Sequence, residues 1–285
     1  MRHMRHMRHM GPLRHMQHMR PLQDWSPQGI VGVLTDIDDT LTTAGAITAE
    51  ALQALTDLRE AGLPVVAITG RPVGWSEPFA QSWPVNAIVA ENGAVALLHE
   101  PHTGLRKLYQ QSPETRRTHF ERLQAVLQNI EQRIEGAKRA RDSAGRETDI
   151  AIDHSEFTHL PPAAIDEVVR RMQAEGMTAT VSSIHVNGWF GEHSKLTGAR
   201  WIVRELWGRD LDAEIQHWVY VGDSTNDQLM FAHFPHSIGV ANIRRFESQL
   251  SHRPRYISPG ERGAGFAQVV QHLLNPKNQL GSDPN

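Results

Sequence analysis

Three carboxylates lie within four positions near the start of the chain, at Asp36, Asp38 and Asp39. They follow an apolar run, residues 30–34, that reads as a short buried strand. Side chains alternate along a strand, so Asp36 and Asp38 can point to the same side. Two such carboxylates repel each other unless a cation lies between them, and Mg²⁺ prefers oxygen ligands of this kind. The alternative is an ordinary acidic strand end that leads into a turn.

Polar side chains also lie at the ends of two later apolar runs and at the start of a predicted helix. They are Thr69, Gly70 and Arg71 after residues 64–68, Asp223, Asn226 and Asp227 after residues 218–221, and Lys195 at the start of a helix over 195–207. In an open α/β sheet the ligand crevice lies just outside the carboxyl ends of the strands. We therefore expect all these groups to converge on one edge of a sheet.

Alternating strands and helices supply that sheet. Residues 30–34, 64–68 and 87–90 are predicted to be strands, and residues 48–62 a helix between the first two. Residues 218–221 are predicted to add a further strand. This order indicates βαβ units around a parallel sheet, so the fold class is α/β.

A second α/β module interrupts the first. Residues 95–110 are predicted to form a hairpin, and helices follow at 112–134 and 161–176. Strands are predicted at 149–153 and 178–186. The module has helices and strands of its own, which indicates an inserted domain.

These patterns divide the chain into domains. We assign residues 28–95 and 188–274 to the main domain and residues 96–187 to the insert. Residues 1–27 are expected to be a disordered head and linker, because the Met-Arg-His repeats at their start have low complexity. Histidine tracts can bind transition metals, and the alternative is that the head has no part in function. Residues 275–285 are expected to be a flexible tail.

Composition excludes several classes of protein. The formal net charge of the 285 residues is −3, so no bulk charge favours a nucleic-acid or membrane partner. No stretch approaches the roughly 20 apolar residues that span a bilayer. The chain has no cysteine, which excludes disulfides and thiolate chemistry and fits a cytoplasmic location. The oligomeric state stays open.

The four polar clusters, in this order, resemble the four motifs of the haloacid dehalogenase superfamily of phosphatases. The resemblance covers residues 30 to about 274, and its most specific parts are residues 36–40 and 222–227. The insert lies between the second motif and Lys195, with residues 91–93 (Glu-Asn-Gly) before it. This placement is similar to the subclass with a large α/β cap, which includes sucrose-phosphate and mannosyl-3-phosphoglycerate phosphatases. The resemblance implies a Rossmann-like parallel-sheet core with an inserted α/β cap.

The resemblance also implies catalytic roles. Asp36 would be the nucleophile, and Asp38 would be the general acid and then the base. Thr69 would donate a hydrogen bond to the phosphoryl group, and Lys195 would supply a positive charge to it. Asp36, Asp223 and the backbone carbonyl of Asp38 would hold Mg²⁺.

Further residues are expected around this centre. Asn226 and Asp227 would orient Lys195 or metal-bound water. The expected substrate contacts are Gly70, Arg71 and Asn187, with Arg146, Asp149 and Asp153 as additional candidates in the insert. Solvated polar positions are the alternative for each candidate in the insert. The sequence departs from the commonest family pattern at Asp39, where Gly is frequent, and this departure removes no catalytic group.

Together these features predict a Mg²⁺-dependent phosphatase that forms an aspartyl-phosphate. Its partner would be a small phosphorylated metabolite, with a sugar phosphate as the expected substrate. A phosphomutase or phosphotransferase, in which another hydroxyl replaces water, is the alternative enzyme. A non-catalytic binding module is the other alternative, but such a module has no need for both a nucleophile and an acid.

Overall fold

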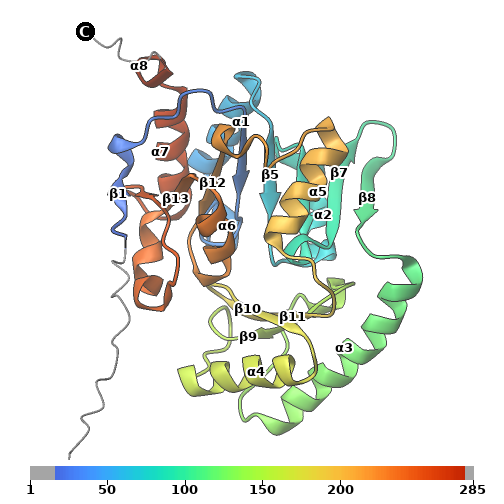
Figure 1. Cartoon of the computed structure of the whole chain (residues 1–285). Coiled ribbons are helices and arrows are strands. Elements are labelled where there is room, and N and C mark those ends of the chain that lie inside the picture. The colour runs from blue at the N-terminus through green and yellow to red at the C-terminus, as the bar shows by residue number, and fades with distance from the viewer. Residues whose placement is uncertain (1–16, 280–285) are drawn as a thin grey trace, which may run out of the picture.

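The computed structural model describes residues 17–279 (Figure 1). Within that range the main sheet has nine strands in the order β1-β14-β13-β12-β2-β5-β6-β7-β8. The first seven strands of this order, which ends for them at β6, run parallel to one another. The last two, β7 and β8, pair in antiparallel fashion. In sheet order their bounds are Arg20–Pro21, Tyr256–Ile257, His236–Gly239, Trp218–Gly222, Gly32–Thr35, Val65–Ile68, Ala87–Ala90, Val95–Glu100 and Gly104–Tyr109.

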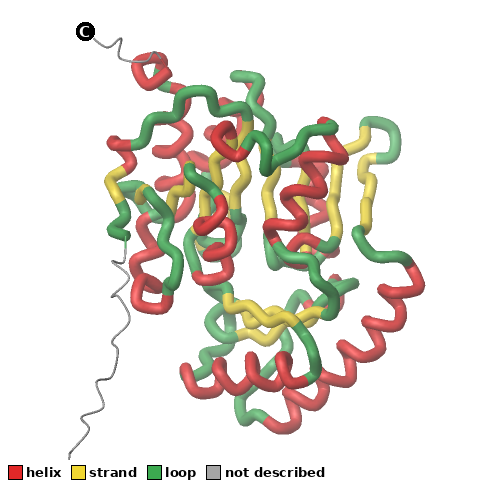
Figure 2. The backbone as a smooth tube through the Cα atoms, in the orientation of Figure 1, coloured by secondary structure: helices red, strands yellow, loops and turns green. Residues whose placement is uncertain are grey.

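Helices cover both faces of this sheet, because its central strands are apolar on both sides. Val33 of β2 packs into one core, and its neighbour Leu34 packs into the other. The first core lies beneath α1 (Ala49–Glu60), α2 (Val73–Ser82) and α7 (Arg262–Leu274). The second lies beneath α5 (Lys195–Trp207) and α6 (Gln228–His233), on the near side of the sheet in Figures 1 and 2. This confirms the predicted α/β fold of the main domain, and we call this domain, built on the main sheet, the core.

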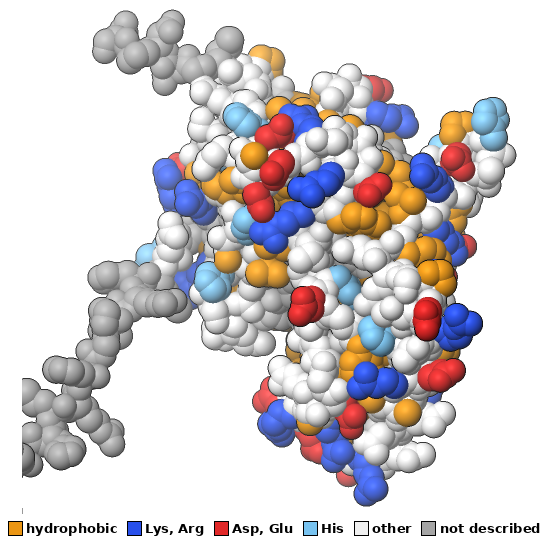
Figure 3. Space-filling model, turned by 45° about the vertical axis from the view of Figure 1, so that its right-hand side comes forward, with side chains coloured by type: hydrophobic (Ala, Val, Ile, Leu, Met, Phe, Trp, Pro, Cys, Tyr) orange, Lys and Arg blue, Asp and Glu red, His pale blue; other side chains and the backbone are white. Residues whose placement is uncertain are grey.

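A second unit, which we call the cap, spans residues 113–189. Its three-stranded antiparallel sheet has the order β10-β11-β9, with bounds Thr178–Val181, His185–Trp189 and Ile150–Asp153. The long helix α3 (Pro113–Arg133) and α4 (Pro162–Ala174) pack on its outer face, and its other face is turned to the core (Figure 2). Positive and negative side chains are interspersed over the visible face of core and cap (Figure 3).

The insert begins later than predicted. The hairpin at residues 95–110 forms as expected, but as β7 and β8 it extends the main sheet next to β6. Val95, Ala96 and Leu97 are fully buried there. The boundary at residue 96 was therefore wrong, because a local pattern predicts a hairpin without showing which sheet it joins.

The N-terminal segment is also more structured than predicted, as far as it is described. β1 pairs with β14, and Leu22 and Trp25 are buried in the core. Trp25 donates its indole N–H to His236, and its ring stacks on His272. Residues 20–27 are thus a strap across the sheet edge and not a linker. Residues 1–16, with the repeats predicted to be a disordered head, lie outside the described residues.

The remaining short elements lie at the sheet edge and the chain end. β3 (Thr42–Thr43) and β4 (Ala46–Ile47) form a small hairpin after the first motif. α8 (Pro276–Gln279) lies in the predicted tail. The side-chain amide of Asn278 donates a hydrogen bond to the backbone carbonyl of His272. Residues 280–285 lie outside the described residues. Between residues 17 and 279, no helix is long and apolar enough to span a membrane.

Candidate active site

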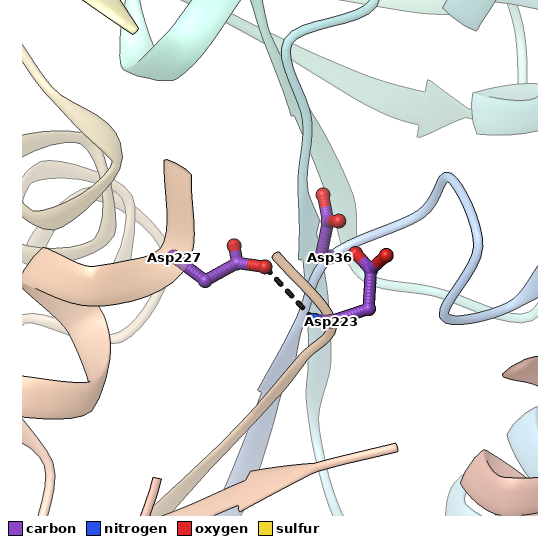
Figure 4. A group of neighbouring side chains, drawn as sticks. All are labelled: Asp36, Asp223 and Asp227. Atoms are coloured by element: carbon purple, nitrogen blue, oxygen red, sulfur yellow. Dashed lines mark hydrogen bonds between the residues drawn. The ribbon is translucent and has the colours of Figure 1, made fainter. Parts of the chain in front are cut away.

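Two acidic side chains meet at the carboxyl ends of two paired strands. In the parallel register of β2 and β12, Thr35 lies beside Val221, so the chain continues from both strands at the same edge. There Asp36 and Asp223 lie side by side, with Asp227 on the following turn η5 (Thr225–Asp227) (Figure 4). All three carboxyl groups are buried. The structure thus brings the first and last predicted motifs together.

The carboxylate of Asp227 accepts hydrogen bonds from four groups of the protein. One carboxylate oxygen accepts from Lys195 and from the Tyr220 hydroxyl. The other accepts from the backbone N–H groups of Asp223 and Ser224, at 2.9 and 3.2 Å. Asp227 therefore holds the loop and the lysine in place, although its oxygens lie within 4.8 Å of those of Asp36 and Asp223.

Lys195 links the two sides of this cluster. It opens α5, whose start is fixed by a capping box between Ser194 and Thr197. Its Nζ lies 2.8 Å from Asp36 and 2.9 Å from Asp227. Burial lowers the pKa of Lys195, but the two carboxylates outweigh burial and raise it above its ordinary value. The side chain therefore stays cationic beside Asp36.

Asp36 and Asp223 carry more negative charge than the protein compensates. Burial raises the pKa of Asp36 to about 7, against the opposing effect of Lys195. Burial and the neighbouring carboxylates, Asp36 first, raise the pKa of Asp223 well above its ordinary value. The protein's own side-chain contacts to Asp223 are long, 3.4 Å from Thr40 and 3.3 Å from Asn242. A buried, underneutralised pair of oxygen donors fits a divalent cation such as Mg²⁺.

Asp39 adopts the left-handed backbone conformation with φ 57°. Glycine reaches this conformation without strain, and Asp is one of the few other residues that visit it. The side chain of Asp39 pairs with Arg262 at 3.1 Å. This accounts for an acid at a position where the family often has Gly.

The second motif lies beside the acids at the end of β5. The hydroxyl of Thr69 accepts from the backbone N–H of Arg71 at 3.0 Å, which leaves its proton free to be donated. The carbonyl of Gly70 accepts from two cap side chains, Arg146 at 3.0 Å and Asn187 at 3.3 Å. A Cβ at position 70 would come within 3.2 Å of the Asn187 side chain, so glycine permits this close approach.

Arg71 bridges core and cap. Its Nε lies 3.0 Å from both carboxylate oxygens of Asp38. On the cap side it contacts Asp142 at 3.0 Å and Glu156 at 2.7 Å. Burial lowers the pKa of Arg71, and Asp38 and Glu156 outweigh that effect and raise it. The guanidinium predicted to contact substrate is here paired with three carboxylates.

Several side chains at the interface between core and cap were not predicted from the sequence. Glu156 and Asp142 lie in irregular cap segments, and His185 contacts Glu156 at 2.8 Å. In a polar, non-periodic stretch no local pattern distinguishes them from solvated residues. Arg146 and Asp149 were candidates, and they form a buried ion pair at 2.9 Å. Asp153 lies apart from these contacts, because its carboxylate accepts from the backbone of residues 155–158.

Glu91 connects core and cap in another way. It lies in the turn η2 (Glu91–Gly93), where Glu91 and Asn92 both have positive φ. Its carboxylate accepts from the backbone N–H groups of residues 147, 148 and 149 in the cap, at 2.8, 2.8 and 3.3 Å. Burial and the nearby Asp149 raise the pKa of Glu91 to about 8. The Glu-Asn-Gly sequence was the available signal for this contact.

A small cavity lies between these groups. It is lined by the core residues Asp36, Asp38, Gly70, Arg71 and Asn226 and by the cap residues Ser182, Ile184, His185 and Asn187. Its volume is about 10 Å³, which is room for about one water molecule. The structure therefore represents a closed arrangement of cap on core.

The chain is similar in sequence to known hydrolases. The family model described as haloacid dehalogenase-like hydrolase matches residues 33–132. A phosphoglycolate phosphatase from Methanothrix thermoacetophila is 25% identical over 251 residues, which cover 86% of this chain and 97% of that relative.

Solved structures share the fold. A protein from Thermoplasma acidophilum matches with a TM-score of 0.64 at 17% identity, covering 86% of this chain and 98% of that one. Sucrose-phosphatase from Synechocystis, in complex with sucrose and phosphate, matches with a TM-score of 0.61 at 16% identity, also covering 86% and 98%. At these identities the likeness shows the fold alone: a parallel main sheet with an inserted cap.

Proposed function

We propose that this chain, which is similar to haloacid dehalogenase-like hydrolases over residues 33–132, is a Mg²⁺-dependent phosphatase acting through an aspartyl-phosphate. One observation carries the proposal. A buried, underneutralised carboxylate pair, Asp36 and Asp223, lies next to the fixed cation of Lys195, and a further acid, Asp38, follows two residues after Asp36. Phosphoryl transfer requires this combination of nucleophile, positive charge and acid.

In the first step an Asp36 oxygen bonds to phosphorus while the bond from phosphorus to the leaving oxygen breaks. Asp38 gives a proton to that oxygen, and Lys195 and Thr69 stabilise the charge on the phosphoryl group. Asp36, Asp223 and the backbone carbonyl of Asp38 would hold Mg²⁺, which neutralises phosphoryl charge when bound. In the second step Asp38 takes a proton from water, whose oxygen attacks phosphorus and releases Asp36 and inorganic phosphate.

We infer that the substrate is a small phosphorylated metabolite, with a sugar phosphate first among the classes. The closed site supports a small substrate, because the cavity between core and cap at Asp36 and Asp38 has a volume of only about 10 Å³. The phosphoglycolate phosphatase relative makes phosphoglycolate the second candidate.

Phosphate release by the purified full chain tests this function. The panel holds sugar phosphates, phosphoglycolate and p-nitrophenyl phosphate. We expect turnover with Mg²⁺, loss of turnover in excess EDTA and recovery on adding Mg²⁺ back. Full activity in EDTA would remove Asp36 and Asp223 as metal ligands. Transfer of labelled phosphate to another hydroxyl, without release, would instead identify a phosphomutase or phosphotransferase.

A further inference from the structure

The guanidinium of Arg71 is saturated by carboxylates. Its Nε contacts Asp38, its first terminal nitrogen contacts Asp142 and Glu156, and its second contacts Asp38 and Glu156. Every nitrogen of the group is thus engaged, and the side chain is only 4% exposed. An incoming anion can bind Arg71 only by displacing a carboxylate that is already there.

The charges around Arg71 do not balance. Arg71 contacts Asp38, Asp142 and Glu156, and Asp142 is also paired with Arg146, which itself pairs with the buried Asp149. Two guanidinium groups thus face four carboxyl groups. Burial raises the pKa of Glu156, but the hydrogen bonds from His185 and Arg71 outweigh it and lower this pKa to about 2. The charged cations nearby, Arg146 above all, outweigh burial and lower the pKa of Asp142. Both cap acids are therefore ionised at neutral pH.

The leaving group of a substrate must lie in this environment. Asp38 has to turn from Arg71 towards the leaving oxygen, and Arg71 then keeps the two cap acids as partners. A carboxylate on the leaving alcohol would meet Glu156 and Asp142 without a free cation to receive it, and like charges at such distances are strongly unfavourable. Alcohol hydroxyls can instead donate to these carboxylates and bond to Asn187 and Ser182, which line the cavity.

We propose that Glu156 and Asp142 are specificity-determining residues that act as a charge filter in the cap. They favour phosphate esters of neutral, polyhydroxylated alcohols and discriminate against esters whose alcohol carries a carboxylate. This inference rests on the proposed phosphatase function. It predicts that phosphoglycolate, the substrate named for the curated relative, is a poor substrate for this chain.

The test compares two small esters, glycerol 1-phosphate and phosphoglycolate, at neutral pH with Mg²⁺. We expect kcat/KM of the full chain to be at least about tenfold higher for glycerol 1-phosphate. Glu156→Gln removes one negative charge while it keeps the size of the side chain. It should shift the ratio of the two kcat/KM values about tenfold towards phosphoglycolate, chiefly through KM.

The control is Glu167→Gln, the same change on the exposed outer helix of the cap, where Glu167 pairs with Arg171. It should leave the ratio unchanged. Asp142→Asn is the second variant if Glu156→Gln disturbs folding, which thermal unfolding would reveal.

Equal or better use of phosphoglycolate by the wild-type chain would overturn the charge filter. An unchanged ratio in both Glu156→Gln and Asp142→Asn would also overturn it. In either case, turnover of p-nitrophenyl phosphate would show that the phosphatase function stands. If p-nitrophenyl phosphate and all other esters are left intact, the proposed function fails and the filter with it.

Discussion

Asp36 and Asp38 are two residues apart and have different partners. Asp36 lies 2.8 Å from the buried Lys195, whereas Asp38 is held 3.0 Å from Arg71 at the edge of the cap. The first environment places the proposed nucleophile beside a fixed cation. The second holds the proposed general acid on Arg71, from which it would have to part to reach a leaving group.

This difference predicts distinct effects of two substitutions. Asp36→Asn should abolish the phosphoenzyme and almost all turnover, because the nucleophile is lost. Asp38→Asn should impair sugar phosphates most, since their alkoxide is a poor leaving group. With p-nitrophenyl phosphate it should still form a phosphoenzyme, which then accumulates. Rapid-quench detection of phosphoenzyme decides this, and phosphoenzyme in Asp36→Asn would show that the roles are wrongly assigned.

Asp227 offers a residue-scale test of stability. It is fully buried and accepts from Lys195, Tyr220 and two backbone N–H groups. Removing one partner of a buried charged pair costs roughly 3 kcal/mol or more. We therefore expect Asp227→Asn to lower the free energy of unfolding by about this amount and turnover by about 10²-fold, because Lys195 is misplaced.

Urea denaturation and kcat measure both effects of Asp227→Asn. Asp212→Asn, which alters the exposed contacts of Asp212 with Arg200 and His233, is the matched control and should change the free energy of unfolding by less than about 1 kcal/mol. A stable Asp227→Asn with unaltered turnover would contradict the anchoring role.

Residues in the motifs could be predicted from sequence because they follow apolar strands at fixed positions. Asp36, Thr69 and Asp223 lie together for that reason. Glu156 and Asp142 could not be found this way. Their position beside Arg71 depends on how the cap docks on the core, and no local pattern encodes that.

At the scale of elements, the turn η2 couples the end of β6 to the cap through Glu91. The pKa of Glu91 is raised from 4.5 to about 8 by burial and Asp149. Between these values the folded protein holds a proton that the unfolded chain has released. The contribution of Glu91 to the free energy of unfolding is therefore fully present below about pH 4.5. It is lost as pH rises towards 8, by up to about 1.4 kcal/mol per pH unit.

Glu91→Gln mimics the protonated side chain and should remove this dependence. The free energy of unfolding of the variant, relative to wild type, should rise steadily from pH 5 to pH 8 in urea denaturation. Glu60→Gln, at an exposed position on α1, serves as control and should give a flat difference. A flat difference for Glu91→Gln as well would mean that Glu91 is ionised in the folded state.

Elements with a regular apolar pattern were predicted well, and the sheet that an edge strand joins was not. The strands β2, β5, β6 and β12 form where expected, as do α1, α4 and α5. The β7–β8 hairpin was assigned to the wrong unit, and β1 was not predicted. β1 depends on pairing with β14, which is far away in sequence. The hairpin pairs with β6, the strand just before it, and periodicity does not reveal which of the two sheets it joins.

At the scale of the whole molecule, the close approach of the cap to α2 depends on two glycines, Gly145 and Gly74. A Cβ added at Gly145 of the cap would lie 3.0 Å from the Cα of Gly74 in α2. Gly145→Ala should therefore keep the cap slightly open. We expect kcat/KM for a sugar phosphate to fall about tenfold or more, because closure positions substrate and excludes water.

The aryl ester p-nitrophenyl phosphate depends less on leaving-group protonation, so its turnover should fall less in Gly145→Ala. Ala144→Val adds bulk at the neighbouring exposed position and is the control for this substitution. An equal loss for both esters, or no loss for either, would argue against a role for this contact in closure.

The strap at residues 20–27 has a practical consequence for anyone trimming the chain. Removing residues 1–16 leaves β1 in place, whereas removing residues 1–27 bares the edge strand β14 and empties the space of Trp25. Loss of a buried Trp costs about 3–5 kcal/mol, and an unpaired strand edge recruits further chains. Light scattering should therefore show the shorter protein aggregating at concentrations where the chain lacking only residues 1–16 remains dispersed.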